Sequence, residues 1–112
     1  MLFRSVSQSR YADAIGLNCG CPQKWAISEG IGGALSAQPE LVAEMVKEAK
    51  NFSNLPINIK IRLHKDMRVT IDLVRKAIHA GVGWITVHGR TVDQRTQQVN
   101  VEAVGLVSTS II

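Results

Sequence analysis

The sequence predicts an α/β fold in which short strands alternate with helices and pair into a parallel sheet. Two observations predict it. Short apolar runs with strand-like alternation recur at residues 14–18, 57–63 and 84–88, and amphipathic runs occupy residues 39–50 and 67–80 between them. At 112 residues, with 46% hydrophobic and 20% charged residues, the chain has room for one modest domain.

Each helix carries signals at its ends. The segment PELVAEMVKEAK at 39–50 begins with proline, which suits a first helical turn, and its apolar residues form one stripe. Glu40 near its start and Lys50 near its end complement the helix dipole. The segment 67–80 stops at Gly81, as helices commonly do. A further helix is predicted to start within residues 101–107.

Composition narrows the class of protein. The formal net charge of +4 and the sequence pI near 9.4 favour an anionic partner, although the basic residues are scattered. No apolar run approaches the ~20 residues that a membrane-spanning helix needs, so no membrane association is expected. Two cysteines are too few for a disulfide scaffold, which predicts an intracellular protein with reduced thiols, cytoplasmic with the nucleus and mitochondrion left open.

Three polar residues share one face of the predicted sheet. Period-two alternation sets Asn18, Lys60 and His88 against the apolar residues of the same strands. A parallel sheet normally has both faces covered, so a polar face requires a reason. In a barrel this face points inward, and the carboxyl ends of barrel strands carry the chemistry. A solvated lysine or a structural histidine is the plainer interpretation of each residue alone, but their coincidence favours a site.

The stretch NCGCP at 18–22 raises the question of a metal clip, a disulfide or one reactive thiol. A structural zinc site needs about four ligands, and the sequence has neither a second cysteine pair nor a suitably spaced histidine pair, so no metal is expected. Cys19 is expected to be a small buried hydrophobe. Cys21 lies between Gly20 and Pro22, at a sharp exit from the strand, and is the thiol that a ligand could reach.

Two further segments suggest contact with an anion. GIGGAL at 30–35 is rich in glycine, but it does not match the dinucleotide fingerprint and lies well after its strand, so a flexible loop is the alternative. HGRT at 88–91 leaves a strand with an arginine and a glycine, which would let backbone N–H groups approach a phosphate.

These segments together resemble the tRNA-dihydrouridine synthase family, in particular its eukaryotic 20a/20b branch. The resemblance covers about residues 11–100, and the motifs occur in the order NCGCP, GIGGAL with PELV, IKIR and ITVHGRT. It implies a flavin-binding TIM (β/α)8 barrel followed by a small helical domain. It also implies an FMN-dependent oxidoreductase that uses NADPH or NADH to reduce uridine in tRNA to dihydrouridine.

The resemblance implies a role for each matched residue. Cys21 matches the family's catalytic cysteine, which protonates C5 of the uracil while hydride from the reduced flavin N5 reaches C6. Asn18 matches a residue near the flavin and the target base. Lys60 and His88 match flavin contacts, and Arg90 is a weaker match of the same kind. The target uridine would have to be unstacked to enter the barrel mouth.

Length limits what the chain can supply. A complete barrel takes roughly 250 residues, so residues 11–112 are expected to form a partial TIM barrel of about three consecutive βα units, truncated at both ends, with residues 1–10 as a lead-in. Its two exposed sheet edges would favour self-association. Our hypothesis is a chain that carries the sequence of the catalytic centre but is inactive alone. The alternative is a non-catalytic remnant that binds RNA or a partner chain.

Overall fold

A computed structural model describes residues 12–94 and 96–110. Three parallel strands form its sheet in the order β1-β2-β3, namely β1 (Ile15–Cys19), β2 (Ile57–Arg62) and β3 (Trp84–His88). The predicted lead-in, residues 1–10, lies outside the described residues.

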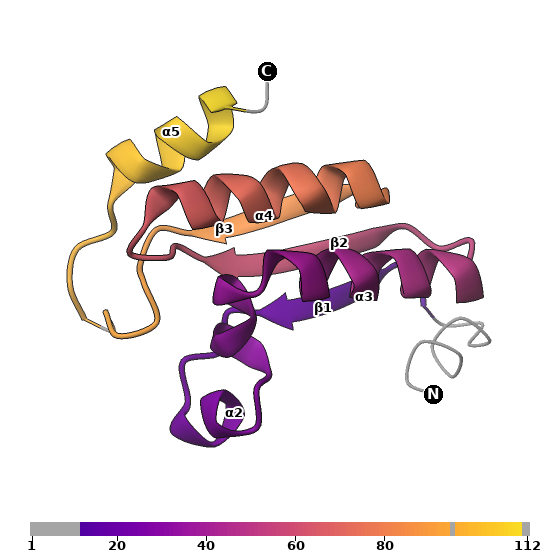
Figure 1. The fold of residues 1–112 in the computed structure, drawn as a ribbon, viewed down its shortest axis with the longest axis horizontal. Helices are drawn as coiled ribbons and strands as arrows, with labels where there is room; N and C mark the ends of the chain where they lie inside the picture. Colours follow the sequence, from indigo (N-terminus) through magenta and orange to yellow (C-terminus); the bar gives the residue numbers. More distant parts are fainter. Residues whose placement is uncertain (1–11, 95, 111–112) are drawn as a thin grey trace.

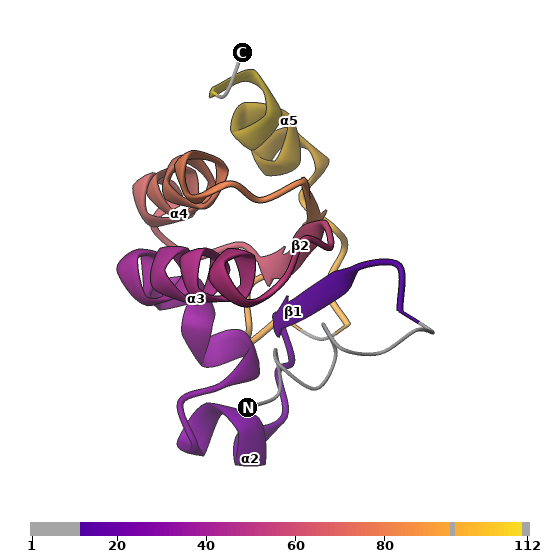
Figure 2. The same ribbon diagram turned by 90° about the vertical axis from the view of Figure 1, so that its right-hand side faces the viewer.

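The longer helices all lie on one side of this sheet. They are α3 (Pro39–Phe52), α4 (Met67–Ala80) and α5 (Val101–Ser110). Helices α3 and α4 run side by side over the strands, and α5 follows beyond α4 (Figures 1 and 2). Two short elements, α2 (Lys24–Ser28) and the 3₁₀ helix η1 (Gly32–Ala37), connect β1 to α3 at the end of the sheet that the arrowheads reach (Figure 1).

The core forms between the sheet and the helices. Ile57, Ile59 and Ile61 of the central strand are completely buried, as are Val42 and Val46 of α3. Apolar residues of α4 close the same core. The opposite face of the sheet carries the alternate, mostly polar residues, and the helices of the described segments leave that face uncovered (Figure 2).

The predicted α/β class is confirmed, and the arrangement is that of consecutive βα units of a TIM barrel. Helix α4 and strand β3 have the predicted bounds, whereas β1 begins and ends one residue later than predicted and therefore includes Cys19. Helix α3 continues two residues beyond residue 50, and α5 starts at Val101, within the predicted range 101–107. Helix α2 and η1 are not predicted, because five or six residues are too few for a helical period to be recognised.

The ends of α4 show why this segment folds as predicted. Asp66 caps its start by accepting a hydrogen bond from the N–H of Arg68 at 3.0 Å. Gly81 ends it in the left-handed conformation, with φ of 105°. No helix in residues 12–94 or 96–110 has the length and apolar character that crossing a membrane would take.

Candidate active site

The carboxyl ends of the strands bring four polar side chains onto the uncovered face. The strand register places Asn18 beside Lys60, and Arg62 beside His88. The burial pattern of β2 alternates as predicted, with its isoleucines buried and Lys60 exposed. The shared face predicted from the sequence is therefore present in the structure.

The turn that follows β1 is shaped by Asn18. Its Oδ1 accepts a hydrogen bond from the backbone N–H of Gly20 at 3.0 Å. Asparagine commonly forms turns of this kind by bonding to the backbone two residues later. The side chain thus fixes the path of the chain into Cys21, a local function that the resemblance did not suggest.

The two cysteines have different surroundings. Cys19 is fully buried in the core, and this burial raises the pKa of its thiol to about 11. Cys21 is half-buried, and both thiols are free. The predicted difference between a packed Cys19 and a reachable Cys21 is confirmed. In the part of the chain that the structure describes, no three His, Cys, Asp or Glu side chains gather as a metal site would require.

The glycine-rich segment packs against the Cys21 turn. Gly32 and Gly33 are buried in η1, and the N–H of Gly33 donates to the carbonyl oxygen of Cys21 at 2.7 Å. The interpretation of this segment as a flexible loop is therefore wrong for η1. Anion contact through these backbone N–H groups is also disfavoured, since Gly33 already uses its own within the protein.

His88 lies among positive charges. The pKa of His88 is lowered first by partial burial and then by the charges of Arg62, Arg90 and Lys60. Nη1 of Arg90 lies 3.1 Å from Nε2 of His88. Because a guanidinium only donates, Nε2 is the acceptor, and this assigns the proton of the neutral ring to Nδ1. His88 therefore presents an N–H donor within a cationic cluster.

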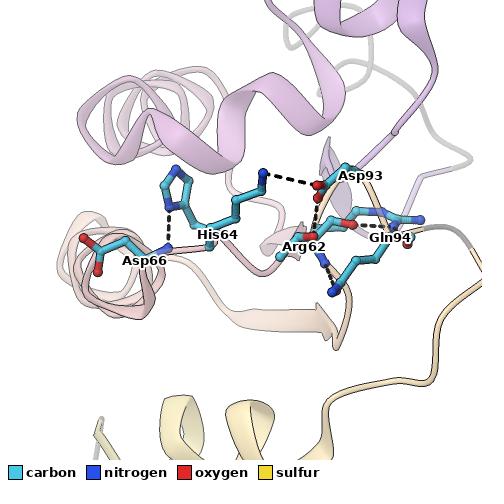
Figure 3. A network of polar contacts seen from close by, with 7 residues as sticks. Arg62, His64, Asp66, Asp93 and Gln94 are labelled. Atoms are coloured by element: carbon cyan, nitrogen blue, oxygen red, sulfur yellow. Dashed lines mark hydrogen bonds and ion pairs between the residues drawn. The ribbon is translucent and has the colours of Figure 1, made fainter.

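Arg62 connects this cluster to the loop after β3. Its Nη1 donates to the carbonyl oxygens of Thr91 and Gln94, both at 3.1 Å. Gln94 in turn accepts from the backbone N–H of Thr91, and Asp93 pairs with Lys65 at 3.2 Å (Figure 3). Alternation along β2 puts Arg62 on the same face as Lys60, but the sequence suggested no role for it. A cation at the last position of a central strand, on the inward face, was the available signal.

Lys60 remains available for a ligand. Within residues 12–94 and 96–110, no hydrogen bond or ion pair engages its ammonium group. Arg90, by contrast, also donates through Nε to the carbonyl of Gln97 at 2.7 Å. A free ammonium beside a neutral imidazole donor suits a ligand that is rich in acceptor atoms and carries negative charge.

Comparison with known proteins identifies the family. The family model for dihydrouridine synthase (Dus) matches residues 4–111. The chain belongs to this family. The tRNA-dihydrouridine(20a/20b) synthase (NAD(P)+)-like protein of Mus musculus is 48% identical over 104 residues, which are 90% of this chain and 32% of that protein. The corresponding synthase of Saccharomyces cerevisiae is 44% identical over 90% of this chain and 28% of its own length.

Bacterial members of the dihydrouridine synthase family are also similar. The tRNA-dihydrouridine synthase B of Proteus vulgaris is 35% identical over 71% of this chain and 25% of its own length. The chain thus spans about a third or less of these curated relatives. The family resemblance drawn from the motifs is confirmed, while the roles of Cys21, Asn18, Lys60, His88 and Arg90 stay predictions.

Proposed function

We propose that this chain carries the catalytic centre of a dihydrouridine synthase, an enzyme that reduces the C5=C6 bond of a uridine in tRNA with FMN and with NADPH or NADH. The observation that carries this proposal is the placement of the half-buried Cys21 at the same end of the sheet as the uncovered cationic face. The names of the relatives, which specify tRNA-dihydrouridine synthases and NAD(P)+, support it.

The uncovered face fits FMN by the chemistry of its donors. Lys60 would supply charge and hydrogen bonds to the carbonyl-rich ring, and the neutral His88 would donate through Nδ1. Asn18 offers its amide group, and Arg90 adds positive charge near the end of β3. Bound here, FMN would supply the hydride that adds to C6 of the uracil.

Cys21 would act as the general acid. Its S–H bond breaks as a C–H bond forms at C5, and together with the hydride at C6 this completes the two-electron reduction of the double bond. The resulting thiolate takes up a proton from solvent before the next turnover. A positioned acid typically contributes about 10²- to 10⁴-fold in rate. Cys19 cannot replace it, because its thiol is sealed in the core.

The rim beside Cys21 supports an RNA substrate. A hollow of about 510 Å³ is lined by Pro22, Lys24, Trp25 and Val92, among others. Trp25 is 60% exposed in spite of its size. Enzymes that act on a base must unstack it, and exposed aromatic side chains stack on bases with little regard to sequence. We propose that the RNA nucleotides next to the target uridine bind on this rim.

The experiment that tests the proposal begins with flavin. The purified chain is mixed with FMN, freed of excess and measured for absorbance between 350 and 500 nm beside a Lys60→Met variant. Bound flavin near one per chain, lost in the variant, supports the proposal, and tRNA reduction that disappears in Cys21→Ala while flavin remains would complete it. A flat spectrum for the unaltered chain would instead favour the non-catalytic alternative, binding RNA or a partner.

One observation favours the alternative of a non-catalytic protein that binds a partner chain. Strands β1 and β3 are both edge strands of this sheet, and open edges favour pairing with other chains. We propose that the chain self-associates through them, which sedimentation velocity over a concentration series would detect. A single monomeric species at every concentration would contradict this.

Both cysteines are free thiols, which suits the cytoplasm as the compartment we propose.

A further inference from the structure

The position of Cys21 depends on contacts made by residues outside its own turn. Its carbonyl oxygen is held by the N–H of Gly33 at 2.7 Å. A Cβ built on Gly33 would lie 2.7 Å from that same oxygen and 2.9 Å from Cγ2 of Val92. Real Cβ atoms essentially never approach other atoms this closely. Residue 33 therefore packs closely against both the Cys21 turn and the loop after β3, with no room for a side chain.

Gly32 lies close to the side chain of Cys21. A Cβ built there would lie 2.8 Å from Cβ of Cys21, and the φ of Gly32 is +57°, which by itself favours glycine. Gly33 shows no such backbone requirement, because its φ lies outside the left-handed range. The need for glycine at position 33 thus comes from space alone.

The loop that carries Val92 is also held in place by hydrogen bonds. Val92 belongs to the loop whose neighbouring carbonyls, of Thr91 and Gln94, accept hydrogen bonds from Arg62. That loop follows directly on the segment carrying His88 and Arg90. The cationic face and the Cys21 turn are therefore connected by a continuous chain of contacts.

We propose that Gly33 and Val92 are positioning residues that clamp Cys21, so that the placement of the acid depends on the loop that follows the flavin-contacting strand β3. The activity part of this proposal rests on the proposed function, whereas the placement of the thiol does not. Gly33 acts on the backbone of Cys21 directly, through its hydrogen bond, and Val92 acts through its packing beside Gly33.

Gly33→Ala is the sharpest perturbation, and Gly105→Ala is its matched control. A Cβ at Gly105 of α5 meets nothing within 4 Å, so the same chemical change is made where space is open. The first readout is the rate at which iodoacetamide alkylates Cys21, mapped by peptide mass spectrometry. Cys19 is buried and serves as the internal reference. We expect faster labelling of Cys21 in Gly33→Ala, because the displaced turn exposes the thiol, and no change in Gly105→Ala.

The second readout is tRNA reduction at saturating tRNA. A displacement of about 1 Å at a reacting group can cost on the order of 10²-fold, so kcat should fall by about that factor while KM is unchanged. Adding Val92→Ala to Gly33→Ala should restore part of the loss, because residue 33 can then move away from the Cys21 carbonyl. General unfolding would also expose Cys21 and slow the enzyme, but it would expose the buried Cys19 as well, so unchanged labelling of Cys19 and an unchanged circular dichroism spectrum separate a displaced turn from unfolding.

Val92→Ala alone keeps the proposal testable if Gly33→Ala does not fold. The substitution shortens a half-buried side chain of the loop and introduces no clash. Because the packing beside Gly33 is then looser, labelling of Cys21 should again be faster than in the unaltered chain. Unchanged labelling in every folded variant would overturn the clamp. If labelling changes as expected but no form reduces tRNA, the clamp is supported and the proposed function of this chain fails.

Discussion

Removing the side chain of Asn18 should destabilise the fold, and restoring only its acceptor oxygen should cancel the loss. Asn18→Ala deletes the Oδ1 that accepts a hydrogen bond from the backbone N–H of Gly20, and Gly20 is buried. A buried N–H left without a partner costs about 1–3 kcal/mol. Because Asn18 itself is exposed and water can replace part of the bond, we expect the free energy of unfolding to fall by about 1 kcal/mol.

Asn18→Asp separates the structural role from ligand binding. The carboxylate keeps an oxygen that can accept from Gly20, and it lies in register with the cation of Lys60. Its free energy of unfolding should therefore stay within about 0.5 kcal/mol of the unaltered chain. The amide NH₂ is lost, however, so any contact that this group makes with flavin or uracil is lost in both variants.

Urea unfolding at pH 7, followed by circular dichroism, measures both effects. Stability reduced in Asn18→Ala and retained in Asn18→Asp would confirm the turn, and weakened flavin binding in both would assign the amide to the ligand. Equal destabilisation of the two variants would refute the reasoning, because the turn would then depend on something other than the acceptor oxygen. Unchanged stability in both would show that solvent fully replaces the hydrogen bond.

Three further outcomes are expected. Lys60→Met should weaken FMN binding in equilibrium dialysis by about ten- to a hundredfold, since one hydrogen bond to a charged group contributes about 1.5–3 kcal/mol; unchanged affinity would remove Lys60 from the site. The raised pKa of Cys19 contributes stability that is complete below pH 9.0 and lost as the pH rises through about 11. Urea unfolding should show this loss of about 2–3 kcal/mol in the unaltered chain but not in Cys19→Ala, and parallel pH profiles would contradict it. The lowered pKa of His88 contributes stability that is present above about pH 6.5 and lost as the pH falls below it, so His88→Gln should flatten this part of the profile, whereas an identical acid limb would exclude His88 as its cause.

Local signals account for the elements that the sequence predicts well. Helix α4 has a clear apolar stripe and a glycine stop at Gly81, and the structure gives it the predicted bounds. Strand β3 is also matched, because its alternation and the following HGR segment delimit it. Helix α2 escapes this reasoning, since one turn of helix held by the surrounding loop has no periodicity of its own.

The site is predictable only in part. Alternation along each strand is a local property, so the common face of Asn18, Lys60 and His88 follows once the strands are parallel. The partners of Arg62 lie 29 and 32 residues away along the chain, in a loop with no regular pattern. Such contacts depend on how the loop folds back over the sheet, which no spacing in the sequence states.

The glycine-rich segment shows most clearly how one composition can have two physical causes. Gly32 and Gly33 are adjacent, and in the sequence both indicate conformational freedom. Only Gly32 uses it, with a φ of +57°, whereas Gly33 has no room for a side chain because Cys21 and Val92 occupy the space around the position of its Cβ. If backbone conformation were the only constraint at Gly32, asparagine, which tolerates left-handed backbone, would be accepted there. Since a Cβ at Gly32 would also meet Cys21, both positions exclude side chains, and the backbone of η1 packs directly against the Cys21 turn.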